Sequence, residues 1–293
     1  MFKGSFTALV TPFTDQGGID LEAFDRLLDF QLEQGSDGLV VAGTTGESAA
    51  LLQDEFAALL DRAVKRVDGR VPVIAGTGGA ATGRTLEQTL LAADLGADAA
   101  LVVTPYYVKP PQRGLLAHFS SVAEASPIPV VLYNVPGRTS VDMLPETVAA
   151  LSEHPNIAGI KEAVGDPGRV ERLVELCPQD FCLLSGDDPT CLASMKLGMD
   201  GVISVAANAA AAPMHAMCAA ALKSDWAEAD RLNERLAPFF TALALETNPI
   251  PVKWAVYAMG LAGSAIRLPL AELDEQHHGA LNSALQDLGL VPG

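Results

Sequence analysis

The sequence of 293 residues is poor in cysteine and in positive charge. Its four cysteines form no Cys-x-x-Cys pair and have no histidines at zinc spacing, which argues against a zinc site and for buried thiols in a reducing compartment. The 19 Lys and Arg residues stand against 36 Asp and Glu, a formal charge of −17. Because such a field repels phosphates, nucleic acid and anionic membranes are not expected as partners.

Targeting and membrane signals are also scarce. Met1–Phe13 lacks the basic region, the long apolar run and the small-residue cleavage site of a signal peptide. Gly201–Leu222 has no charged residue and is long enough to span a membrane. However, Asn208, Pro213 and His215 interrupt it, and alanine outnumbers leucine. We therefore predict a strand followed by a buried helix in this stretch, and a soluble, cytoplasmic protein.

The sequence does contain a series of eight short, apolar and mostly β-branched runs. Continuous rather than alternating hydrophobicity is typical of strands buried on both faces of a parallel sheet. Successive runs begin about 20 to 33 residues apart, the length of one strand–helix unit. The runs are Phe6–Val10, Leu39–Ala42, Val71–Ala75, Ala99–Thr104, Pro129–Asn134, Ile157–Lys161, Phe181–Ser185 and Gly201–Val205.

Helix signals lie between the runs. Thr82–Gly96 begins with a capping residue and ends at glycine, and Asp188–Gly198 begins with Asp-Pro and also ends at glycine. An open doubly wound sheet normally has fewer strands, so the pattern predicts an α/β fold, a closed (β/α)8 TIM barrel over residues 1–225.

The strand signal disappears at Trp226. The segments Trp226–Leu245 and Pro251–Leu261 have the pattern of helices. We therefore predict a small C-terminal helical domain over residues 226–293, packed on the barrel because no low-complexity linker separates the two.

The ends of the predicted strands carry the polar groups, and this edge of a parallel barrel holds the active site. Lys161 ends an apolar strand, where loss of water disfavours its ammonium form, and a neutral amine there can form an imine with a ketone. Alternatively, it reaches solvent or pairs with Glu162. Tyr133 ends the preceding strand and places a phenol within reach for proton transfer, unless it is only a core aromatic.

Two groups near this lysine are suited to anions. The turn Gly43–Gly46 brings backbone N–H groups close to an anion, and Thr44 and Thr45 add hydroxyl donors. Arg138, after the fifth strand, offers a planar fork for a second carboxylate. Two anion sites beside one amine indicate two carboxylated substrates.

Two other patterns compete with this interpretation. Gly76–Ala81 fits the loose dinucleotide pattern GxGxxA, with Asp94 and Asp98 near the distance of a ribose contact, but it follows the third strand rather than the first. Asp187 and Asp188 are a candidate magnesium site, but we expect no third carboxylate at a neighbouring strand end. The chemistry at Lys161 requires neither a metal nor a cofactor.

Five motifs are together highly specific, and a sixth, NPIPVKWA at Asn248–Ala255, lies in the C-terminal helical region. The five are GTTGES at Gly43–Ser48, TPYY at Thr104–Tyr107, YNVPGRT at Tyr133–Thr139, GIKE at Gly159–Glu162 and LLSGDD at Leu183–Asp188. With these six motifs the chain resembles, nearly end to end, the 4-hydroxy-tetrahydrodipicolinate (dihydrodipicolinate) synthases of the pyruvate aldolase and N-acetylneuraminate lyase superfamily. The resemblance implies a lyase of the class I aldolase type, with pyruvate and L-aspartate 4-semialdehyde as substrates in the diaminopimelate route to lysine. It also implies a homotetramer made of two tight dimers.

The resemblance assigns the catalytic roles to four residues. Lys161 looks like the lysine that forms the Schiff base with pyruvate. Tyr133 matches the family's proton donor and acceptor, in a relay with Thr44 and Tyr107, and in the family the last of these reaches in from the neighbouring subunit.

Four further residues match substrate-binding positions of the family. Thr45 matches the residue that holds the pyruvate carboxylate, and Ile203 the one whose backbone lines the same pocket. Arg138 matches the arginine that receives the carboxylate of the semialdehyde, and Gly186 a backbone contact nearby.

Two alternatives remain open at this stage. N-acetylneuraminate lyases and keto-deoxy-sugar aldolases resemble the chain at the lysine and the tyrosine, but they usually have an apolar or small residue in place of Arg138. A catalytically silent paralogue that only binds or regulates is the other alternative, and the intact Lys161, Tyr133, Thr44 and Arg138 argue against it.

The resemblance also predicts that lysine, the pathway end product, inhibits this protein weakly or not at all. The inhibitor crevice of sensitive relatives corresponds to seven positions here, of which three agree with the sensitive pattern and four depart from it. Ser48, Ala49 and Tyr106 agree; Gln53, Phe56, Ala80 and Arg84 depart.

Arg84 stands where sensitive relatives have a glutamate, so attraction for the ligand's ammonium becomes repulsion. Phe56 and Ala80 remove hydrogen-bond partners, each at a cost of about 1–3 kcal/mol to a buried polar ligand. Steady-state assays with lysine up to about tens of millimolar check the prediction. Half-inhibition below about 1 mM, which corresponds to roughly −4 kcal/mol of binding, would contradict it.

Overall fold

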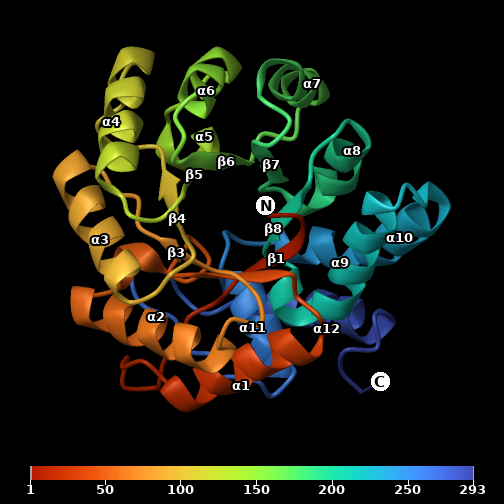
Figure 1. Cartoon of the computed structure of the whole chain (residues 1–293). Helices are drawn as coiled ribbons and strands as arrows, with labels where there is room; N and C mark the ends of the chain where they lie inside the picture. Colours follow the sequence, from red (N-terminus) through yellow and green to blue (C-terminus); the bar gives the residue numbers. More distant parts are fainter. Residues whose placement is uncertain (1, 293) are drawn as a thin grey trace.

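Eight parallel strands form a closed barrel in the order β1 to β8, and helices surround it (Figure 1). The computed structural model describes residues 2–292. The predicted TIM barrel is thereby confirmed, and each strand overlaps its predicted run. The strands are β1 Gly4–Ala8, β2 Gly38–Val41, β3 Val73–Gly76, β4 Ala99–Val103, β5 Val130–Asn134, β6 Ile157–Glu162, β7 Cys182–Ser185 and β8 Gly201–Ser204.

Helices follow the strands on the outside of the barrel. The α-helices are α1 Leu21–Glu33, α2 Gln53–Val67, α3 Thr82–Asp94, α4 Gln112–Ala125, α5 Pro136–Thr139, α6 Pro145–Ser152, α7 Pro167–Leu176, α8 Cys191–Lys196, α9 Ala207–Leu222, α10 Trp226–Leu243, α11 Ile250–Ala258 and α12 Glu275–Asp287. Two short 3₁₀ helices, η1 (Ser48–Ala50) and η2 (Asp188–Thr190), follow β2 and β7. The helix expected over residues 188–198 is therefore divided into η2 and α8, because the Asp187 side chain accepts the N–H of Thr190 and starts a tight turn there.

Both faces of the strands are buried, which explains their continuous hydrophobicity. In β2, Val40 belongs to the cluster inside the barrel, whereas Leu39 and Val41 pack in the cluster beneath α1 and α2. Successive side chains thus point to opposite faces, as the pleat of a strand requires. Tyr133 and Ile203 share the interior cluster with Val40.

The uncharged stretch from Gly201 to Leu222 forms β8 and the largely buried helix α9, as predicted. Among residues 2–292, no helix is both long and apolar enough to cross a membrane. The cysteines are free; Cys182, Cys191 and Cys218 are buried, and burial raises the pKa of the half-buried Cys177 to about 11.

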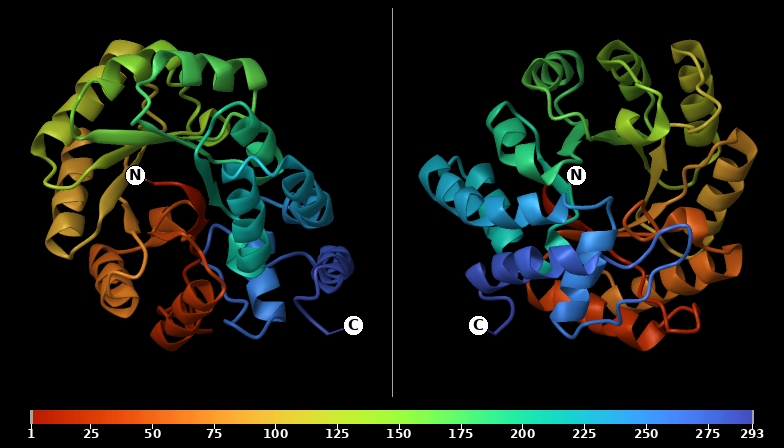
Figure 2. Two further views of the ribbon diagram at one scale, coloured as in Figure 1. Left: turned by 45° about the vertical axis from the view of Figure 1, so that its right-hand side comes forward. Right: turned by 180° about the vertical axis from the view of Figure 1, so that it is seen from behind.

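Helices α10, α11 and α12 follow the barrel, and their core is continuous with it. Met214 of α9 packs in one cluster with Phe239, Trp254 and Leu281. Seen from behind, these helices and the loops between them lie in front of the barrel (Figure 2, right). The division into domains at residues 225 and 226 stays a prediction.

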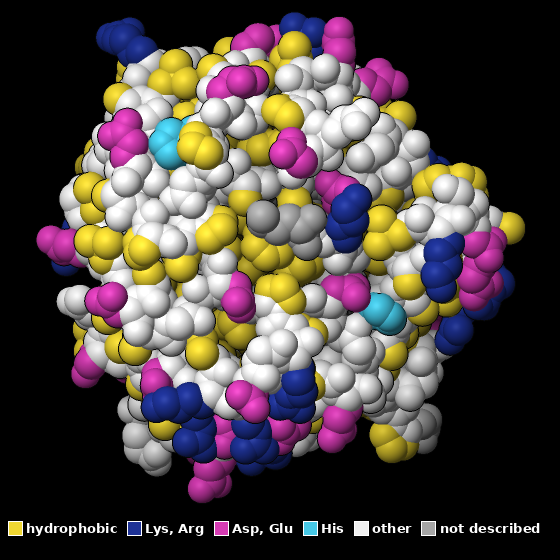
Figure 3. All heavy atoms as spheres, viewed as in Figure 1, with side chains coloured by type: hydrophobic (Ala, Val, Ile, Leu, Met, Phe, Trp, Pro, Cys, Tyr) yellow, Lys and Arg dark blue, Asp and Glu magenta, His cyan; other side chains and the backbone are white. Residues whose placement is uncertain are grey.

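Opposite charges on the surface gather over α1 and α2, at the lower edge of the face shown in Figure 3. Arg62 pairs there with Asp25, and Arg66 with Asp29, across the two helices. Such exposed pairs are screened by solvent and contribute little to stability. The fold depends instead on its buried clusters.

His118 of α4 is a buried titratable group of the outer layer. Its Nδ1 atom lies 2.9 Å from the Thr82 hydroxyl, and its ring packs edge-on against Phe119 with the centroids 4.9 Å apart. Burial lowers the pKa of His118 to about 4, whereas an unfolded histidine titrates near 6.5. As the pH falls from about 6.5 to about 4, the unfolded chain takes up a proton that the folded chain excludes, so stability is lost.

We predict that His118→Gln removes this contribution. Relative to wild type, the free energy of unfolding of the variant should be constant above about pH 7 and rise by about 1–3 kcal/mol between pH 6.5 and 4. Urea unfolding of both proteins across that range measures the difference. A difference that is independent of pH would show that His118 is not held neutral by the fold.

Candidate active site

The structure brings Lys161 and Tyr133 together at the C-terminal ends of β6 and β5. The two residues are direct partners in the strand register, and both are buried, with 4% and 6% of their surface exposed. The Lys161 Nζ atom lies 4.5 Å from the centre of the Tyr133 ring. An amine and a phenol therefore face the same interior space.

The alternative that Lys161 pairs with Glu162 or reaches solvent is wrong. Glu162 points to the other face of β6, where its Oε2 accepts the Nε–H of Arg169 at 2.8 Å. Among the described residues, Lys161 forms no salt bridge, and it is almost fully buried. In the part of the chain that the structure describes, its amine therefore has no carboxylate within ion-pair distance.

A buried polar network lies directly behind this pair. Asn134 follows Tyr133 in β5, and its Nδ2 donates to both oxygens of Glu162, at 3.1 and 3.2 Å, and to Asp142 at 2.9 Å. The Arg169 Nη2 lies 3.0 Å from Asp142. Burial raises the pKa of the Glu162 carboxyl, while the Arg169 guanidinium acts in the opposite direction. The network fastens the ends of β5 and β6 to each other and to α7.

The sequence does not reveal this network, and the expectation that no third carboxylate lies at a strand end next to Asp187 and Asp188 is wrong. Glu162 is such a carboxylate, but its side chain lies outside the barrel and its oxygens are taken by Asn134 and Arg169. The alternation of side chains along β5 and β6 could have placed Asn134 and Glu162 together, whereas nothing in the sequence marks Arg169 as their partner.

Gly186 follows β7 and lies against the aliphatic part of Lys161. A Cβ atom at this position would be 2.9 Å from the Lys161 Cε and 3.0 Å from the Ala163 Cβ. Any larger residue at position 186 would therefore displace the Lys161 side chain from its present conformation. Ile203 of β8 is fully buried in the interior cluster that includes Tyr133, so it forms an apolar wall of the same space.

The turn after β2 presents the two predicted threonines. Thr45 is buried and Thr44 half-buried. The Thr45 hydroxyl oxygen accepts the Nδ2–H of Asn248 at 3.0 Å, and the Thr11 hydroxyl donates to the Gly46 carbonyl at 2.7 Å. The turn is thus held on both sides.

Arg138 lies exposed in α5, just after β5, and Asn248 links it to the turn. The Arg138 Nη2 donates to the Asn248 carbonyl oxygen at 3.0 Å, and the Asn248 side chain donates to Thr45. Asn248 therefore bridges the two predicted anion sites. The sequence places it in a motif but gives no sign that it contacts a turn 203 residues away.

Of the other two predicted catalytic residues, Thr44 is half-buried in the turn after β2 and Tyr107 is exposed. The Tyr107 side chain is 91% exposed, and its backbone has a left-handed φ of +69°. Within a single chain Tyr107 faces solvent, and its relay with Thr44 and Tyr133 stays a prediction.

The competing patterns have structural explanations. A Cβ at Gly76 would lie 2.2 Å from the Ala42 carbonyl oxygen, and one at Gly78 would lie 2.3 Å from the Val103 nitrogen, so these glycines permit close contact between neighbouring strands. The Asp188 Oδ2 accepts the N–H groups of Val205 and Ala206 at 3.0 and 2.8 Å. Within residues 2–292, His, Cys, Asp and Glu side chains form no group of three placed to hold a metal.

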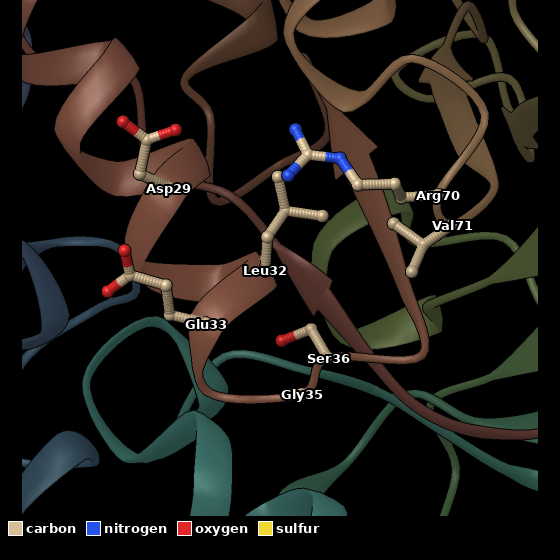
Figure 4. Close-up of a pocket in the computed structure, with 7 residues that line it drawn as sticks. All are labelled: Asp29, Leu32, Glu33, Gly35, Ser36, Arg70 and Val71. Carbon is tan, nitrogen blue, oxygen red and sulfur yellow. The ribbon is translucent and has the colours of Figure 1, made fainter.

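A separate hollow of about 290 Å³ lies at the opposite end of the strands (Figure 4). It is lined by Asp29, Leu32, Glu33, Gly35, Ser36, Arg70 and Val71. The Arg70 guanidinium donates to the carbonyl oxygens of Val67, at 2.9 Å, and of Arg66, at the end of α2. None of the described residues that line the hollow is a lysine, so the hollow does not supply the amine that the chemistry expected at Lys161 requires.

Of the positions implied for the inhibitor crevice, Phe56 is 2% exposed and packs in the core beneath α1 and α2. Gln53 and Arg84 are exposed. The buried Phe56 presents no polar group to a ligand.

Comparisons with known proteins agree over nearly the whole chain. The sequence model of the Dihydrodipicolinate synthetase family matches residues 1–288. The 4-hydroxy-tetrahydrodipicolinate synthase of Ectopseudomonas mendocina (strain ymp) is 51% identical over 291 residues, which are 99% of this chain and 100% of that protein.

Two solved structures are similar throughout. The chloride-inhibited dihydrodipicolinate synthase of Acinetobacter baumannii, complexed with pyruvate, has a TM-score of 0.98 and 45% identity, covering 99% of this chain and 100% of that one. A structure described as the first monomeric dihydrodipicolinate synthase variant has a TM-score of 0.97 and 42% identity, covering 99% and 98%.

Proposed function

The chain belongs to the dihydrodipicolinate synthetase family, and from this premise we propose that it condenses pyruvate with L-aspartate 4-semialdehyde to 4-hydroxy-tetrahydrodipicolinate. The reaction is of the class I aldolase type and lies in the diaminopimelate route to lysine. The observation that carries the proposal is the buried, unpaired amine of Lys161 beside the Tyr133 phenol.

The first half of the reaction uses this pair. The Lys161 amine adds to the keto carbon of pyruvate and water leaves, so that an imine forms and withdraws electrons from the methyl carbon. Tyr133 then accepts a proton from that methyl group, and an enamine results. We assign Thr45 to the pyruvate carboxylate, while Gly186 leaves room at the lysine and Ile203 supplies an apolar wall.

The second half joins the two substrates. The enamine carbon attacks the aldehyde carbon, and the new alkoxide takes up a proton from the relay assigned to Tyr133, Thr44 and Tyr107. The amine of the semialdehyde then attacks the imine carbon and displaces Lys161, which closes the ring. One molecule of water is released overall. Arg138, exposed beside the site, is suited to hold the second carboxylate.

The outward position of Tyr107 supports an assembly in which each copy completes the site of its neighbour. We propose a homotetramer made of two tight dimers, located in the cytoplasm. The exposed Tyr106, Tyr107 and Val108 form an aromatic and apolar loop that suits such a contact.

Lys161 is predicted to be the residue that binds pyruvate covalently. Borohydride reduction in the presence of pyruvate should add one covalent adduct to the wild-type chain, and Lys161→Ala should not acquire it. Mass spectrometry of the reduced peptides locates the adduct. An adduct on another lysine would overturn the assignment, whereas slow residual turnover in Lys161→Arg would not, because binding and orientation persist without covalent catalysis.

Arg138 is predicted to select the aldehyde and to leave imine formation intact. Loss of a charge-assisted, bidentate contact costs about 2–5 kcal/mol, so Arg138→Ala should lower kcat/KM for the semialdehyde by about 30-fold to several thousand-fold. Arg172→Ala, an exposed arginine of α7, is the matched control and should behave as wild type. If imine formation in Arg138→Ala falls as much as turnover of the semialdehyde, the arginine acts elsewhere in the mechanism. Cleavage of N-acetylneuraminate by the wild type would also contradict the role of Arg138 in selecting the aldehyde.

A further inference from the structure

A buried ion pair joins the turn after β2 to the C-terminal helices. Glu47 follows the two threonines of this turn and has a left-handed φ of +55°. Its Oε1 accepts the Nζ–H of Lys253 of α11 at 2.5 Å, and the two side chains are 2% and 3% exposed. Its Oε2 accepts the backbone N–H of Arg267 at 3.1 Å. The carboxylate thus fastens the turn to two C-terminal segments at once.

The charges around this pair are balanced. The Lys253 ammonium lies 4.4 Å from the centre of the Phe13 ring, and the Arg267 guanidinium lies 4.2 Å from it. Arg267 in turn pairs with Glu55 of α2 at 2.5 Å. Burial lowers the pKa of Lys253, and Glu47 opposes that shift. Two cations therefore face two carboxylates around one ring.

The same two segments are joined a second time at the candidate active site. Asn248 lies five residues before Lys253, and it donates to Thr45, two residues before Glu47. The carbonyl of Asn248 accepts Arg138. The contacts Thr45–Asn248 and Glu47–Lys253 therefore form two parallel links between the turn and the chain that leads into α11. Together they determine where Asn248, and with it Arg138, lies relative to Thr45.

We propose that Glu47 and Lys253 are positioning residues that set the separation between the two carboxylate sites, Thr45 and Arg138. The inference rests on the proposed function, because it assumes that both sites are occupied in one reaction. A buried ion pair is often no more stabilising than well-packed neutral residues of the same size, so stability alone does not account for it. A fixed separation of the two carboxylate sites accounts for the ion pair, since displacements of about 1 Å change reaction rates by as much as about 100-fold.

The test uses the double variant Glu47→Gln/Lys253→Met, which removes both charges, keeps the length of the Glu47 side chain and shortens that of Lys253 by one atom. We expect a cooperatively folded protein that still forms the borohydride-trapped adduct at saturating pyruvate. The KM for the semialdehyde should rise about 10- to 100-fold, with a much smaller change in the KM for pyruvate. The matched control is Lys196→Met/Asp230→Asn, which removes an exposed pair between α8 and α10 that also joins the barrel to the C-terminal helices. It should have wild-type kinetics.

Several results would overturn the inference. Wild-type KM values for both substrates in a folded double variant would do so, and so would an equal loss of adduct formation and of semialdehyde turnover. If the double variant does not fold, Glu47→Asp keeps the charge and shortens the side chain by one methylene; an unchanged semialdehyde KM in that variant counts against the inference. If the wild-type chain forms no product, both the proposed function and the inference are rejected. If the wild type turns over normally, a negative result in the variants rejects the inference alone.

Discussion

The pairing of β5 with β6 is the constraint on which the candidate site depends. In this register Tyr133 lies opposite Lys161, and Asn134 lies opposite Glu162. Because side chains alternate along a strand, the first pair faces the interior of the barrel and the second faces α7. A shift by one residue would exchange the two sets, placing the amine among the helices and a carboxylate in the interior. The Asn134–Glu162–Arg169 network opposes such a shift, since each buried polar group in it has partners only in this register.

The second constraint comes from the C-terminal part of the chain. The barrel alone supplies an amine, a phenol and a glycine that leaves room for them, but the two sites suited to carboxylates lie on separate loops. Asn248 bridges these loops, and Lys253 anchors the same segment through Glu47. The C-terminal helices therefore act on the site through contacts between residues that do not react themselves. In a barrel each loop is fixed where it leaves its strand but mobile at its tip, so contacts of this kind restrict the motion of the loop tips.

The strands and the central pair could be predicted because their signals are local. Eight apolar runs at regular spacing indicate a parallel barrel, and the end of each run marks the edge where Lys161 and Tyr133 meet. Asn248 and Lys253 could not be predicted as site neighbours, because their partners in the turn after β2 lie more than 200 residues away in the sequence. Arg169 is only seven residues from Glu162, but nothing in the sequence distinguishes it from the other arginines of the chain. The expectation that no third carboxylate lies at a strand end near Asp187 and Asp188 is wrong, because Glu162 ends β6; its side chain lies on the face of β6 that packs against α7. Tyr107 resembles a family position, but in one chain it faces solvent, so its role stays a prediction.

The role of the network behind Lys161 is tested most directly by the rate of imine formation in Arg169→Met, compared with Arg169→Met/Glu162→Gln. The single variant leaves a buried carboxylate unpaired, so the free energy of unfolding should fall by about 3–5 kcal/mol and borohydride trapping of pyruvate should slow. In the double variant a neutral amide replaces the carboxylate, so most of the stability and of the trapping rate should return. Wild-type stability and a wild-type trapping rate in Arg169→Met would show that the network does not hold Lys161 and Tyr133 in place.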